Sequence, residues 1–168
     1  MNNDTKFIIS ISIRRIAELL DSKILWSNDK ILIPFKHSVL TEVLVLLNDL
    51  LQKSNKFKNR VDFKDDVFIY NHTNKKLKID DVTDLISNFR NLLCHTNTDR
   101  TIATSYLKNL FNLIPKKEIL YEFDDVVVQN KYDDDIAYSS GKNVLYLKRH
   151  IEKSFYCIKE NFKDYILF

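Results

Sequence analysis

Apolar residues recur at intervals of three and four along several stretches of the chain, which is the spacing of one helix face. Residues 7–20 show this pattern, although alternating isoleucines at the start would also suit a strand. Residues 37–52 are apolar over most of a helical circumference, which is typical of a helix that is deeply buried or also packs against a second subunit. We therefore predict two helices. Between them, residues 23–35 predict a small hairpin or an ordered loop that Pro34 ends.

The second half of the chain predicts three more helices. Asp80 or Asp81 can cap the first, whose apolar stripe is Val82, Leu85, Ile86, Phe89, Leu92 and Leu93. A separate polar face of this helix consists of Asp84, Asn88, Asn91 and His95. The next helix begins near Asp99, runs to about Ile114 and stops at Pro115. The last one spans 143–165.

The remaining segments are less helical. Residues 53–66 form a charged connector, 67–70 suit a short strand, and 71–76 form a turn. Residues 117–142 contain two short β-prone runs among aspartates and end at Gly141, which is the only glycine. They predict a small β-hairpin or loop insertion.

Composition supports a helical fold. The chain has 168 residues, enough for one domain with a real core. With Gly 1 and Pro 2, it has little turn chemistry for a sandwich or barrel of many tight hairpins. We therefore predict a single all-α domain over 1–168, a bundle of about five helices.

Charge, cysteines and hydropathy narrow the classes of function. The net charge of +3 is small, so a nucleic-acid partner would need it gathered on one face. Cys94 and Cys157 are too few for a disulfide framework. No apolar run reaches the ~18 residues of a transmembrane helix, and the start lacks the pattern of a secretory leader. These features predict a cytoplasmic protein with reduced thiols and no membrane partner.

The candidate chemistry lies in the stretch 90–95, RNLLCH. Arginine offers a fork of donors to phosphate oxygens and stays charged. Histidine has an unperturbed pKa near 6.5, which suits proton transfer at neutral pH. Together, Arg90 and His95 could cleave RNA without a metal, using the 2′-hydroxyl that DNA lacks. The alternative is that Arg90 is a surface charge and His95 a polar residue near a helix C-terminus.

Helical geometry separates these two residues. Five positions along a straight helix rotate the side chain by roughly 140°, whereas Asn91 and His95, four apart, share a face. One protomer would therefore hold an incomplete site. A two-fold dimer could complete it by bringing two copies of the stretch together.

A helical bundle with Arg90, the polar Asn91, three further residues and His95 late in its central helix resembles the HEPN superfamily (higher eukaryotes and prokaryotes nucleotide-binding domains). Many members are metal-independent endoribonucleases of toxin–antitoxin, phage-defence and CRISPR systems, and act as dimers with a composite site. The resemblance covers the helical order of most of the chain, but its specific part is RNLLCH alone. It implies that Arg90 and His95 are the catalytic pair and that Asn91 supports them. RNA would be the substrate, with no cofactor. The expected partners are a second copy and an antitoxin or regulatory protein. Members that are adenylylated often have a tyrosine two positions after the histidine, where this chain has Asn97, so adenylylation is not expected.

Two other classes of function stay open. The chain could be a non-catalytic HEPN-like module that binds RNA, a nucleotide or a protein, or a purely structural helical dimerisation domain. Basic runs that include Lys56, Lys58, Arg60, Lys75 and Lys76 could hold an RNA backbone, although such runs are more often solvated connectors. A helical cysteine beside leucines, such as Cys94, is expected to be buried. The aspartates at 133–135 are expected to form a solvated acidic loop, and His37, His72 and His150 are too isolated to form a metal site.

Overall fold

The computed structural model describes residues 3–27, 29–67, 79–94, 112–123, 126–140 and 143–166. Its contacts group the chain into two compact units. The helical unit comprises Met1–Val61 and Lys153–Phe168, and the mixed unit comprises Asp62–Glu152. That 1–168 form one domain stays a prediction.

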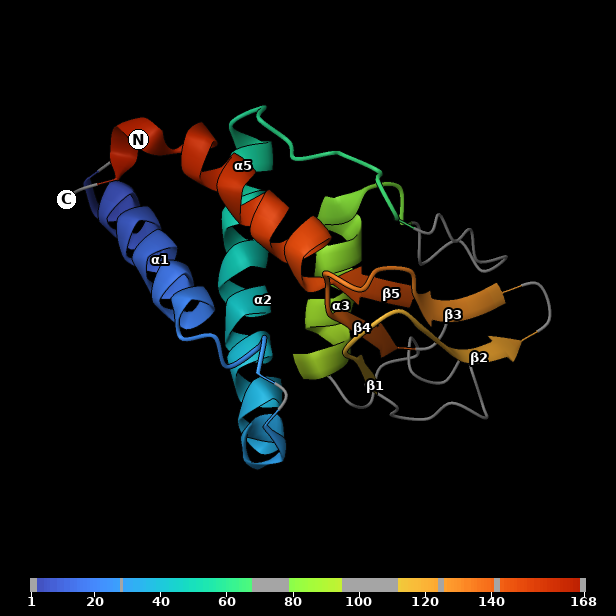
Figure 1. Ribbon diagram of the computed structural model, residues 1–168. Helices are drawn as coiled ribbons and strands as arrows, with labels where there is room; N and C mark the ends of the chain where they lie inside the picture. Colours follow the sequence, from blue (N-terminus) through green and yellow to red (C-terminus); the bar gives the residue numbers. More distant parts are fainter. Residues whose placement is uncertain are drawn as a thin grey trace. The chain divides into compact units, whose positions relative to one another are not determined.

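The helical unit is built on α2 (Ile33–Lys56), and Figure 1 shows α1 (Asn3–Asp21) and α5 (Lys153–Asn161) lying alongside it. Two short 3-10 turns, η1 (Lys30–Leu32) and η3 (Lys163–Tyr165), complete it. Burial of the apolar faces of these helices is the main source of stability here. The buried apolar residues are Ile9, Ile13, Ile16, Leu19, Leu20, Leu25, Leu40, Val43, Leu44, Leu47, Leu50, Leu51, Val61, Phe155, Ile158 and Phe162.

The first two predicted helices are confirmed as α1 and α2. The hairpin alternative for 23–35 is wrong, because turns and η1 connect the two helices. Pro34 also does not end a segment, since it lies in the first turn of α2. A proline is well tolerated at that place because its fixed φ suits a helix start and its missing N–H would have no helical acceptor.

The mixed unit combines α3 (Val82–Cys94) with five described strands. A three-stranded antiparallel sheet has the order β1–β4–β5, formed by Asn112–Ile114, Ala137–Ser140 and Asn143–Tyr146. A separate hairpin pairs β2 (Glu118–Phe123) with β3 (Val126–Asn130) and has a bulge between Ile119 and Tyr121. A π-helical turn, η2 (Leu147–Glu152), follows β5 directly.

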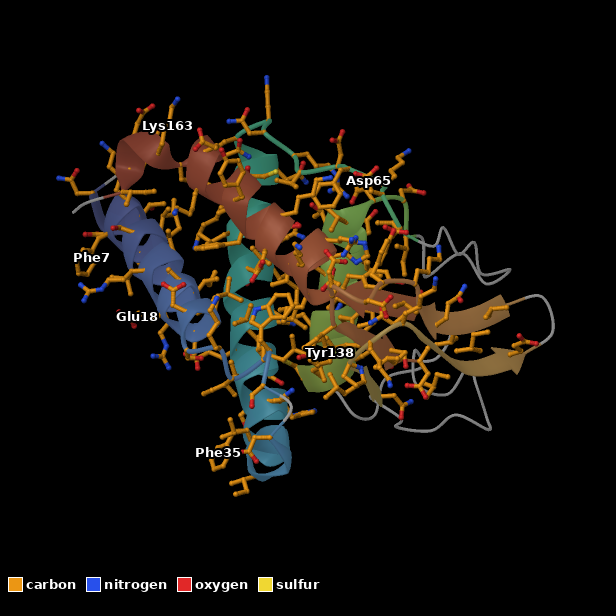
Figure 2. All side chains as sticks on the ribbon, viewed as in Figure 1. Phe7, Glu18, Phe35, Asp65, Tyr138 and Lys163 are labelled. Atoms are coloured by element: carbon orange, nitrogen blue, oxygen red, sulfur yellow. The ribbon has the colours of Figure 1, made fainter. Side chains whose placement is uncertain are left out.

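The core of the mixed unit takes residues from α3 and from both sheets. Figure 2 labels Tyr138, a buried side chain of β4. The buried apolar residues of this unit are Val67, Ile79, Val82, Leu85, Ile86, Phe89, Ile114, Val128, Ile136, Ala137, Tyr138, Leu145, Tyr146, Leu147 and Ile151.

The prediction of an all-α, HEPN-like bundle of about five helices is therefore wrong. The hairpin predicted within 117–142 exists as β2 and β3, but residues predicted to end one helix and to begin another form β1 and β5. The physical reason is strand pairing: Asn112 lies opposite Ser139, and Ala137 lies opposite Tyr146. Such cross-strand partners override a local helical period.

The predicted cap of α3 is confirmed. Asp81 accepts a hydrogen bond at Oδ1 from the backbone N–H of Asp84, at 3.0 Å. Asp84 in turn accepts one at Oδ2 from the backbone N–H of Asp80, at 3.2 Å. These reciprocal bonds satisfy donors that a helix start leaves open, and they fix where α3 begins. Among the described helices of the chain, none is long and apolar enough to span a membrane.

Candidate functional site

Arg90 and Asn91 lie together near the C-terminal end of α3. The Nη1–H of Arg90 donates to Oδ1 of Asn91 at 3.0 Å, and both residues are half-buried. The Nε of Arg90 is buried and has no hydrogen-bond partner among the residues that the structure describes. A guanidinium that is held on one side and keeps donors free can bind a phosphate oxygen.

His95, Lys75 and Lys76 lie outside the described residues, which end at Cys94 on this side of α3. Cys94 is exposed, so its predicted burial is wrong. The last turn of α3 leaves the core, because Phe89 is fully buried whereas Leu92 and Leu93 are only half-buried. Asn88 was predicted on the polar face with Asn91, but it is buried.

The other predicted RNA contacts lie in the helical unit. Lys56 is the last residue of α2, and it is exposed, as is Lys58. Arg60 is half-buried and already engaged in an interaction. The structure therefore brings Arg90 and Asn91 together in the mixed unit, whereas these three basic residues belong to the helical unit.

A second cluster of ionisable side chains surrounds Asp135, which is only 1% exposed. Its Oδ1 accepts from the backbone N–H groups of Ile136 and Lys148, both at 2.8 Å. Its Oδ2 accepts from the backbone N–H and from the Nη1 of Arg149, both at 3.0 Å. Asp135 thus caps the π-helical turn η2, and the prediction of a solvated acidic loop at 133–135 is wrong for this residue.

Arg149 extends the cluster to a tyrosine and a second carboxylate. Its guanidinium carbon lies 3.4 Å from the ring centroid of Tyr132, a cation–π contact. The hydroxyl of Tyr132 donates to Oδ2 of Asp66 at 2.7 Å, and this hydrogen bond raises the pKa of Tyr132. Asp66 has φ of 56°, a left-handed conformation that few non-glycine residues adopt. The cluster therefore ties the connector before α3 to the strands.

His150 is fully buried beside this cluster. The backbone N–H of Tyr146 donates to its Nδ1 at 3.1 Å, so Nδ1 is unprotonated. Its Nε2 lies 2.9 Å from the carbonyl oxygen of Asp65 and must carry the proton. A neutral imidazole with both nitrogens bonded fixes structure, and it has no lone pair or proton left for catalysis.

The sequence offered little signal for this cluster because, apart from the adjacent Ile136, its hydrogen-bond partners are 13 to 66 residues apart. The only hint in the sequence is an aspartate directly before the apolar Ile136, which precedes β4. Within the described ranges, no three His, Cys, Asp or Glu side chains are grouped so that they could hold a metal ion. No family model, curated protein or solved structure matches this chain.

Proposed function

We propose that the protein is a metal-independent endoribonuclease whose composite site, formed between two copies of the chain, uses Arg90, Asn91 and His95. The observation that carries the proposal is the Arg90–Asn91 pair. The Nη1 of Arg90 donates to Oδ1 of Asn91 at 3.0 Å, and the Nε of Arg90 is buried without a hydrogen-bond partner among the described residues. The pair stands at the end of α3, directly before the part of the stretch that supplies His95.

In this reaction His95 accepts the proton of a 2′-hydroxyl, and the 2′-oxygen attacks the adjacent phosphorus. The bond from phosphorus to the 5′-oxygen breaks, the 5′-oxygen takes up a proton, and a 2′,3′-cyclic phosphate remains. Arg90 stabilises the negative charge on the phosphate oxygens as it builds up. Asn91 holds the guanidinium in position for that contact. No step requires a cofactor.

The proposal rests on Arg90, Asn91 and His95 and does not require an all-α fold, because function follows from a site and not from an architecture. We extend it to a cytoplasmic toxin or anti-phage effector that an antitoxin or regulatory protein keeps in check. Expression of the wild-type chain in bacteria should then arrest growth, and His95→Ala should relieve the arrest.

Cleavage of a 5′-labelled RNA in EDTA tests the chemistry. Arg90→Ala or His95→Ala should each lower the rate by roughly 100-fold or more, and DNA of the same sequence should stay intact. Arg14→Ala and His37→Ala are matched controls: the Arg14 side chain is 83% exposed, and His37 is also exposed. Cleavage that needs a divalent cation, or that survives both Arg90→Ala and His95→Ala, contradicts the proposal. RNA binding without any cleavage by wild-type protein supports the alternative of a non-catalytic binding module.

Mixing the two inactive variants tests the composite site. If Arg90 of one copy acts with His95 of the other, a dimer of one Arg90→Ala and one His95→Ala chain keeps one intact site. A statistical mixture should then regain roughly a quarter of wild-type activity. If one copy supplies both groups, every site lacks one of them and the mixture stays inactive.

A further inference from the structure

A short segment at the end of α2 is strongly basic. Residues 53–60, KSNKFKNR, contain Lys53, Lys56, Lys58 and Arg60 and no acidic residue. The chain carries +3 in total, so without the +4 of this segment its remaining residues sum to −1. This is the gathering of charge that a nucleic-acid partner requires.

An exposed aromatic ring lies among these charges. Phe57 follows the last residue of α2 directly and remains 46% exposed. Lys56 and Lys58 flank it in the sequence, both are exposed, and neither forms an ion pair with a described residue. Basic side chains around an accessible ring are the two components of surfaces that bind single-stranded nucleic acid.

The backbone of this segment is held in one conformation. Asn161 at the end of α5 donates from Nδ2 to Ser54 Oγ at 2.8 Å and to the carbonyl oxygen of Asn59 at 3.1 Å. The Phe57 ring meets Phe162 edge-to-face, with centroids 6.2 Å apart. The ring is thus positioned before any ligand arrives, which lowers the entropy lost on binding.

Helix stability explains only part of this composition. Lys53 and Lys56 lie in the last turn of α2, where cations favour the helix dipole. Lys58 lies beyond the helix with φ of 65°, the conformation that glycine adopts at least cost at this position. The Lys58 and Asn59 amides bond to the carbonyls of Asn55 and Ser54, at 2.9 and 3.0 Å, so the backbone motif needs no lysine side chain.

The neighbouring end of α5 adds no net charge. Lys159 and Lys163 alternate there with Glu160 and Asp164, and all four are exposed. Figure 2 labels Lys163 in η3. The basic character of the surface therefore comes from residues 53–60.

We propose that the surface formed by Lys56, Phe57 and Lys58 binds single-stranded RNA, with a base stacked on Phe57 and phosphates contacted by the two lysines. A single strand fits better than a duplex because stacking needs an unpaired base. The binding does not depend on Arg90 or His95, so it stands whether or not the chain cleaves RNA.

Fluorescence anisotropy with a 5′-labelled 2′-O-methyl RNA 12-mer measures binding, since this probe cannot be cleaved through its 2′ position. Lys58→Gly should weaken binding about fivefold at 0.1 M salt and lower the salt slope by about 0.7, the contribution of one single-strand phosphate contact. The same change should raise the melting temperature by roughly 2–5 °C, because glycine relieves the backbone. Phe57→Leu, which keeps an apolar contact with Phe162, should weaken binding roughly fivefold or more.

Two matched controls separate binding from stability. Lys23 is also exposed, follows the end of α1 and has φ of 58°, so Lys23→Gly should raise the melting temperature without changing affinity. Phe35, 57% exposed and labelled near the N-terminal end of α2 in Figure 2, is the control for Phe57, and Phe35→Leu should bind normally. Wild-type affinity in both Lys58→Gly and Phe57→Leu overturns the proposal. A duplex probe that binds as tightly as the single strand overturns it as well.

Discussion

Replacement of Asp135 by alanine tests a side chain of the mixed unit that accepts several hydrogen bonds. The carboxylate accepts four hydrogen bonds, three from backbone N–H groups and one from the Arg149 guanidinium. Asp135→Ala removes all four acceptors. The N-terminal donors of the π-helical turn η2 would then have no acceptor in a buried place.

The expected loss of stability follows from this count. A donor left without an acceptor inside the protein costs about 1–3 kcal/mol. Loss of the ion pair adds less than it would for a fully buried pair, because the Arg149 side chain is 27% exposed and keeps its bond to Asp134. These contributions overlap, because the same oxygen serves both kinds of donor. We therefore expect Asp135→Ala to lower the free energy of unfolding by about 3–5 kcal/mol, a large share of the about 5–15 kcal/mol typical of a domain.

Urea unfolding followed by circular dichroism measures this loss, and the adjacent residue supplies the control. Asp134 also pairs with Lys148 and Arg149, at 2.8 and 2.9 Å, but its side chain is 56% exposed. Water screens such pairs, so Asp134→Ala should leave the unfolding midpoint close to that of the wild type. The two variants remove the same chemical group from neighbouring positions and differ in burial.

Equal midpoints for the two alanine variants would refute the assignment of Asp135 as a buried cap. A double-mutant cycle with Arg149→Met separates the charged bond from the backbone bonds. It should give a coupling energy of about 1–3 kcal/mol between Asp135 and Arg149. A coupling near zero would mean that the guanidinium contributes nothing and that the backbone bonds account for the whole effect.

Three further substitutions have defined outcomes. Asn130 donates from Nδ2 to the carbonyls of Ile114 and Asp135 at 3.0 and 2.8 Å. Asn130→Asp should therefore lower the free energy of unfolding by about 2–4 kcal/mol in the same urea assay. Asn55 of α2 is exposed, and Asn55→Asp should not cause such a loss. Burial raises the pKa of Tyr146 to about 12 from its usual value of 10.0. The raised pKa gives stability that is complete below pH 10 and is lost as pH rises toward 12, so unfolding midpoints of the wild type should fall more steeply across that window than those of Tyr146→Phe. Lys36 is buried near the N-terminal end of α2, and desolvation lowers its pKa. Lys36→Met should therefore raise the unfolding free energy by about 0.5–2 kcal/mol. A lower melting temperature of this variant in thermal denaturation would contradict the prediction.

The sequence was sufficient for elements whose stabilising contacts are local. The helical period marked α1, α2 and α3, and Asp81 marked the start of α3, because these features depend on residues three or four positions apart. The β2–β3 hairpin was also expected, since its strands are joined by a short connection. For the candidate site, the sequence supplied the adjacent Arg90 and Asn91, and the structure adds the bond between them.

Only the tertiary structure decided the character of residues whose partners lie on another strand or element. Val144 and Leu147 fit the spacing of one helix, yet the chain pairs Val144 with Ser139 in a sheet and begins η2 at Leu147. Asp135 belongs to a run of three aspartates that looks solvated, yet it is buried against amides of η2. The helical period predicts neither outcome, because it records which residues are apolar within a few positions. Strand pairing and the burial of a charge depend instead on hydrogen-bond partners that lie on other strands or turns.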